Sequence, residues 1–112
     1  MPDYQAMWKS ESKLPDILLL EANYMLRHAL SLNAKEAGYA NVFQTANLDI
    51  AKRKCMQTMF HGLIVAVTDQ HEEIKLIEKV RAGETKCKPE VPILVTVNGI
   101  SEVLAQKLNE LE

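Results

Sequence analysis

The amino-acid sequence predicts an α/β fold, a doubly wound parallel sheet built from about four β-α units. Short apolar runs alternate with segments of helical spacing along the 112 residues, and the connections between them are short. The two clearest runs, residues 17–20 and 63–67, are apolar throughout. Strands that are apolar on both faces are typical of a parallel sheet covered by helices on each side.

The first half of the chain carries two predicted strands and two predicted helices. After the strand at 17–20, residues 23–37 place apolar side chains at helical spacing and end at Gly38, where a C-cap needs a positive φ. Residues 42–46 are short, with β-branched and aromatic side chains, and predict the second strand. Asn47 then predicts the N-cap of a helix that runs to about residue 59.

The second half continues the alternation after the strand at 63–67. Asp69 followed by Glu72 resembles a capping box and predicts the start of a helix that ends at Gly83. Residues 91–97 predict the fourth strand, and residues 101–112 predict a last helix. The apolar side chains of that last helix are interface candidates: Val103, Leu104, Leu108 and Leu111.

Composition and motifs exclude several classes of protein. The net charge of −2 argues against a general nucleic-acid binder. The apolar runs are far shorter than the ~20 residues of a membrane helix, so we expect no membrane association and a cytoplasmic location. The four glycines are too scattered for a dinucleotide or phosphate cradle, and no cofactor is expected. The two cysteines, Cys55 and Cys87, are expected to be reduced thiols, and no histidine spacing indicates a metal site.

Several segments resemble a known family. Residues 17–23 resemble the first strand and helix start of a two-component receiver domain, which has the CheY-like form of the flavodoxin-like fold. Residues 35–39 and 74–82 resemble the end of its first helix and its third helix, and residues 92–95 its fourth strand. The resemblance covers residues 16–112. It implies a cytoplasmic bacterial signalling domain at 15–112, with strand order 2-1-3-4, preceded by an N-terminal arm at 1–14.

The resemblance also implies a pocket for aspartyl phosphorylation, but the residues that carry the chemistry are altered. Mg²⁺ needs several oxygen ligands, which receivers supply with an acidic pair after the first strand. The acceptor is an aspartate at the end of the third strand, and a hydroxyl follows the fourth. The degenerate pocket positions are Glu21 and Ala22 for the acidic pair, Ala66 or Val67 for the acceptor, and Thr96 or Val97 for the hydroxyl.

The resemblance therefore implies a pseudo-receiver without catalytic residues. We expect it to act in two-component signal transduction through protein–protein interaction, with a signalling protein or its own second copy as the partner. Mg²⁺ is expected only if the pocket is active.

Two alternatives remain. Asp69 lies just past the third strand, and a reshaped loop could bring it into the pocket as an atypical phosphoacceptor. Otherwise a small ligand could bind at the carboxyl ends of the strands. The candidate lining for such a ligand is Glu21, Asn23, Thr68 and Asn98.

The family normally has five β-α units, and if the predicted helix at 101–112 is the fourth, we expect the fifth strand and fifth helix to be absent. The fourth strand would then be an open edge with unpaired backbone groups. A homodimer could cover it. The arm, which carries Tyr4 and Trp8, could also cover this edge. Alternatively, the last helix could take the place of the usual fifth helix. The chain could also be a fragment of a longer protein.

Overall fold

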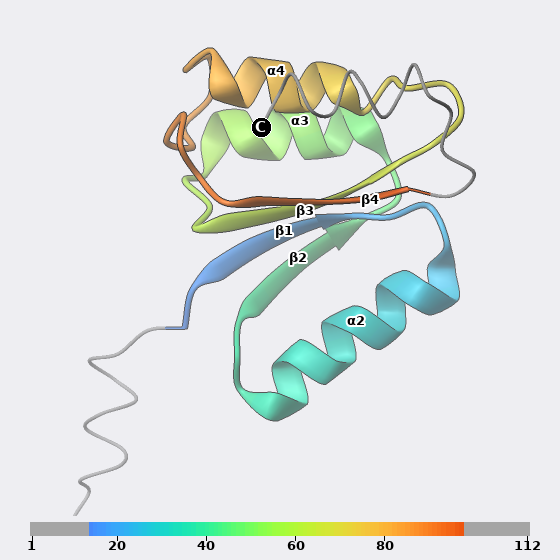
Figure 1. The fold of residues 1–112 in the computed structure, drawn as a ribbon. Coiled ribbons are helices and arrows are strands. Elements are labelled where there is room, and N and C mark those ends of the chain that lie inside the picture. The colour runs from blue at the N-terminus through green and yellow to red at the C-terminus, as the bar shows by residue number, and fades with distance from the viewer. Residues whose placement is uncertain (1–13, 98–112) are drawn as a thin grey trace, which may run out of the picture.

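The computed structural model describes residues 14–97 and has the predicted α/β class (Figure 1). Its four strands form one parallel sheet in the order β2-β1-β3-β4. The strands are β1 (Asp16–Leu20), β2 (Asn41–Thr45), β3 (Gly62–Val67) and β4 (Ile93–Val97). The helices are α2 (Tyr24–Ala37), α3 (Leu48–Gln57) and α4 (Ile74–Arg81). Within residues 14–97, this arrangement is consistent with a flavodoxin-like or CheY-like fold of four strands.

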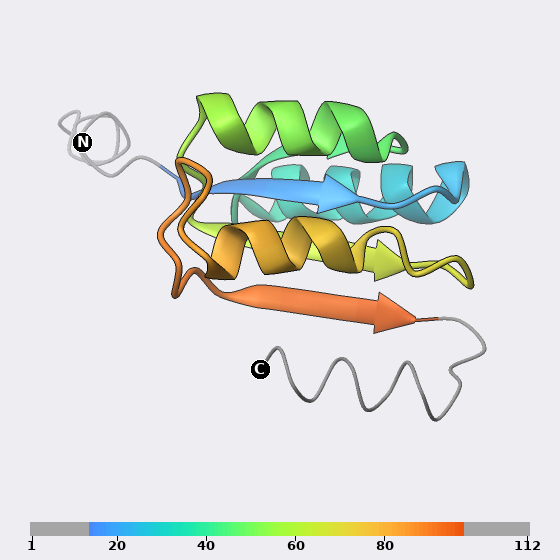
Figure 2. The same cartoon turned by 90° about the horizontal axis from the view of Figure 1, so that it is seen from above.

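The helices are divided unequally between the two faces of the sheet. Helix α2 lies on one face, and α3 and α4 lie side by side on the other (Figures 1 and 2). The strand order explains this division, because the chain moves from β1 outward to β2 and then back across to β3 and β4. Right-handed crossovers in opposite directions place their helices on opposite faces.

The caps predicted at Asn47 and Gly38 are confirmed, and Asn23, which was expected inside the first helix, is its N-cap instead. Asn23 Oδ1 accepts a hydrogen bond from the backbone N–H of Leu26 at 3.0 Å, and Asn47 Oδ1 accepts one from Ile50 at 3.0 Å. Gly38 ends α2 with a φ of 70°, a conformation that glycine adopts without a steric cost. Helix α3 ends at Gln57, two residues earlier than predicted, because Thr58 is extended.

The capping box predicted to start the third helix is wrong, but the helix that the resemblance implies at residues 74–82 is present at Ile74–Arg81. Helix α4 begins at Ile74 and has no side-chain cap, so Asp69 and Glu72 do not form a capping box. The chain instead makes a left-handed turn at His71, whose φ is 61°. The carboxylate of Glu73 accepts hydrogen bonds from the backbone N–H and the hydroxyl of Thr68, and these bonds close the loop.

The loop before β4 is tied to helix α4. The guanidinium of Arg81 donates to the carbonyl oxygens of Pro89 and Val91, both at 2.7 Å. The strand pairing begins at Ile93, after Pro92, which has no backbone N–H to donate.

The last predicted helix, 101–112, lies outside the described residues, as do its interface candidates.

The hydrophobic core lies between the sheet and helices α3 and α4. The strand register aligns Leu18 with Leu63, and Leu63 with Ile93, so that their side chains share this face. The sheet contributes Leu18, Leu20, Leu63, Val65 and Val67, all buried. The helices contribute Ala51, Cys55, Ile74, Leu76, Ile77 and Val80, also buried.

The opposite face is much less covered. Ser31 is the only buried residue of α2, and its hydroxyl has no hydrogen-bond partner among residues 14–97. Leu26 and Leu30 of the same helix are 45% and 39% exposed, and Leu94 of β4 is 59% exposed. The sheet is therefore packed on one face and partly open on the other.

This difference predicts unequal effects of leucine truncation on the two faces. Leu18→Ala, in the packed core, should lower the free energy of unfolding by about 2–5 kcal/mol through lost burial and a residual cavity. Leu94→Ala should change it by no more than about 0.5 kcal/mol, since that side chain is mostly in water. Urea unfolding of both variants measures this. Similar losses would mean that the α2 face is as well packed as the other.

Candidate functional site

The carboxyl ends of the strands are the first place to look for a site, because doubly wound sheets bind ligands there. Glu21 and Ala22 follow β1, and Thr68 follows β3. Thr96 and Val97 end β4.

Glu21 is buried, and its polar groups bond within the β1–α2 turn and to the end of β2. Its carboxylate accepts the backbone N–H of Asn23 at 2.9 Å, and its carbonyl accepts Nη1 of Arg27 at 2.9 Å. Its own N–H donates to the carbonyl of Thr45 at 3.0 Å. The carboxylate therefore shapes the entry into α2, while Ala22 beside it is exposed and adds no oxygen ligand.

The candidate acceptor positions carry only hydrocarbon. Val67 is buried in the core beneath α3 and α4. Ala66 is half-buried and is aligned with Thr96 on β4, while Val67 is aligned with Val97. Neither Ala66 nor Val67 has an oxygen that could take a phosphoryl group. Among residues 14–97, no group of three or more acidic, histidine or cysteine side chains is placed to hold a metal ion.

The remaining candidates at this end of the sheet lie in loops. Asp69 is exposed and directly follows Thr68, inside the loop that the Thr68–Glu73 hydrogen bonds close. Sequence reasoning missed Glu73, since a Thr and a Glu five residues apart form no recognised motif. Asn23 caps α2 and Thr68 bonds Glu73, while Asn98 lies outside the described residues. The polar groups of Glu21, Asn23 and Thr68 therefore stabilise the turns that contain them.

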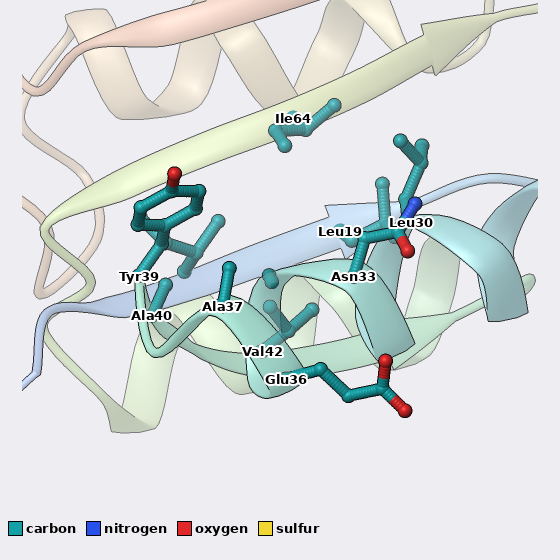
Figure 3. Close-up of a pocket in the computed structure, with 11 residues that line it drawn as sticks. Leu19, Leu30, Asn33, Glu36, Ala37, Tyr39, Ala40, Val42 and Ile64 are labelled. Atoms are coloured by element: carbon teal, nitrogen blue, oxygen red, sulfur yellow. The ribbon is translucent and has the colours of Figure 1, made fainter.

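A different feature is open to binding. A cavity of about 620 Å³ lies between α2 and the sheet, and we call it the α2 groove (Figure 3). Its floor is formed by strand side chains: Ile17, Leu19, Val42 and Ile64. Its wall comes from α2 and the loop that follows: Leu30, Asn33, Ala34, Glu36, Ala37, Tyr39 and Ala40.

The groove exists because α2 does not turn its apolar side chains squarely onto the sheet. Arg27 and Ser31 lie toward the sheet, where Arg27 reaches Glu21 and Gln44 and Ser31 is buried. Leu30 instead lines the α2 groove. Among the described residues that line the groove, Glu36 is the one with a charge. The groove can therefore accept an apolar segment, and Glu36 favours a basic group at its rim.

The two cysteines are brought together in the core. Both are free and buried. The carbonyl of Cys55 accepts the backbone N–H of Lys86 at 2.9 Å, and the thiol of Cys87 lies 3.8 Å from the carbonyl of Thr58. Burial, and to a smaller extent the neighbouring Cys87, raises the pKa of the Cys55 thiol to about 12. Cys55 is therefore protonated and a poor nucleophile at neutral pH.

Comparison with known proteins adds no assignment. No protein-family model matches the chain, and a search of curated proteins finds no match either. Within residues 14–97, none of the helices combines the length and apolar character that crossing a membrane requires.

The raised pKa of Cys55 predicts that alkali destabilises the protein. The folded thiol holds its proton above the ordinary value of 9.0, so stability is complete below that pH and falls as the pH rises toward 12. Cys55→Ala should be less stable at neutral pH, because it leaves a cavity, but its stability should fall less steeply above pH ~9. Urea unfolding across this pH range tests it, and equal slopes for both proteins would refute it.

Proposed function

We propose that this chain is a receiver-like signalling domain that works without aspartyl phosphorylation and acts by binding a protein partner. The observation that carries the proposal is the contrast between the two candidate surfaces. The polar groups at the carboxyl ends of the strands are bonded within their own loops. The open surface is the apolar groove between α2 and the sheet.

The receiver resemblance is supported by the order of elements and by the 2-1-3-4 sheet. The absence of phosphorylation is supported by the side chains at the acceptor positions. Phosphoryl transfer to a carboxylate needs an acceptor oxygen, which Ala66 and Val67 lack, and Mg²⁺ needs more ligands than Glu21 offers. Several parts of the same machinery are missing together.

The chemistry of the α2 groove favours a protein over a small ligand. Its volume of about 620 Å³ would suit either. Small-molecule sites, however, fix their ligand with a few convergent polar groups. The groove offers mainly aliphatic side chains and alanines, and its polar side chains, Asn33, Glu36 and Tyr39, all come from α2 and the loop that follows it. A helix or extended segment that inserts apolar side chains matches this lining, as in other grooves that bind peptides.

The alternative function is phosphorylation at Asp69, which is exposed and lies just past β3. The two functions differ in what a phosphoryl donor does to the chain. Incubation of the purified chain with acetyl phosphate and Mg²⁺ should add no mass, whereas one phosphoryl group would add about 80 Da. Intact-mass spectrometry measures the difference.

Asp69→Asn is the matched control for this experiment, because it removes the carboxylate and keeps the size of the side chain. A gain of one phosphoryl group in the original chain that disappears in Asp69→Asn would overturn the proposal and assign Asp69 as the acceptor. A gain that persists in this variant and maps to Glu21 would overturn it as well.

A further inference from the structure

We propose that the α2 groove is the docking site for the chain's own N-terminal residues 1–13, with Trp8 as the anchoring side chain. The groove and the sequence that precedes β1 support this docking whether or not the domain is a receiver. Only its regulatory consequence, competition with a protein partner, rests on the proposed function.

The start of β1 lies beside the groove. The carbonyl of Pro15 accepts a hydrogen bond from the backbone N–H of Asn41 at 2.9 Å, which holds the start of β1 next to the loop that follows α2. That loop contributes Tyr39 and Ala40 to the groove (Figure 3), and β1 contributes Ile17. The chain therefore enters the sheet at the end of the groove where these three residues lie.

Trp8 is close enough in sequence to reach the whole groove. It is separated from Ile17 by eight residues. An extended chain spans up to ~3.3 Å per residue, so this linker can cover more than the length of β1, which has five residues. Trp8 can therefore reach any part of the groove if the chain folds back along it. The tether also replaces a bimolecular encounter with an intramolecular one, which raises the effective concentration of the segment.

The side chains of the segment match the chemistry of the groove. Residues 1–13 contain the only tryptophan of the chain, and Tyr4 precedes Trp8 by four positions. Tryptophan buries a large apolar area at a low cost in conformational entropy, and it dominates many docking contacts. Lys9 follows Trp8 directly and carries the charge that Glu36 at the groove would favour. The small side chain of Ala34 leaves room for an aromatic ring.

If the proposed function holds, the N-terminal segment and the protein partner compete for the same groove. Partner binding would then require release of Trp8. The arm would weaken the apparent affinity for the partner in proportion to the fraction of time that it occupies the groove.

Because Trp8 is the only tryptophan, its fluorescence reports on the segment without ambiguity. We expect its emission in the full chain to lie at shorter wavelength than in a free peptide of residues 1–13, and acrylamide to quench it several-fold less. Both values should be independent of protein concentration. Emission and quenching equal to those of the peptide would overturn the proposal. A shift that vanishes on dilution would also overturn it, since the occupant would then be a second copy.

Two leucines of α2 provide matched variants. Leu30 lines the groove and is 39% exposed, whereas Leu32 is 43% exposed and does not line it. Leu30→Gln should shift the Trp8 emission toward that of the peptide, and Leu32→Gln should leave it unchanged. Equal effects of the two variants would contradict docking in the groove.

The comparison of full chain and peptide needs no variant, so the test holds even if one substitution disturbs folding. The mass measurement with acetyl phosphate is unaffected by either fluorescence result. Failure of the docking proposal is therefore distinguishable from failure of the proposed function.

Discussion

The fold depends on the apolar contact between one face of the sheet and helices α3 and α4. Strand residues such as Leu18 and Val65 are completely buried there, against Ala51 of α3 and Leu76 of α4. Burial of this kind is the dominant favourable contribution to folding. The free cysteines belong to the same layer, where burial keeps the Cys55 thiol protonated, so that side chain adds packing and no chemistry. This layer holds β1 and β3 in place, and everything on the opposite face is built on it.

Helix α2 is held differently. Its ends are fixed by the Asn23 cap and by Gly38, and Arg27 links it to the turn after β1. Its contact with the sheet buries little, and Leu30 lines the α2 groove. A helix in this position is well defined at its ends and open along one side. This combination suits a binding surface, because the floor beneath it is a hydrogen-bonded sheet and the apolar side chains are accessible.

Local sequence signals predicted much of this fold, but less of the candidate site. Asn47 and Gly38 were predicted correctly because a cap depends on residues within one turn of helix. The capping pattern at Asp69 predicted a wrong helix start, because the left-handed turn at His71 and the Glu73–Thr68 bonds override it. The α2 groove depends on which side chains of α2 face the sheet and which line the space beside them, and no local pattern encodes this placement. The proximity of the two cysteines depends in the same way on a loop that returns to the end of α3.

Native-state hydrogen exchange tests the unequal support of the two faces most directly, since it compares them within one molecule. The amide hydrogens of α3 and α4 should exchange only through global unfolding, because these helices cover the core. Those in the middle of α2 should exchange through a local opening of clearly lower free energy. Equal protection of α2 and α3 would contradict this division, because both faces of the sheet would then support the fold alike.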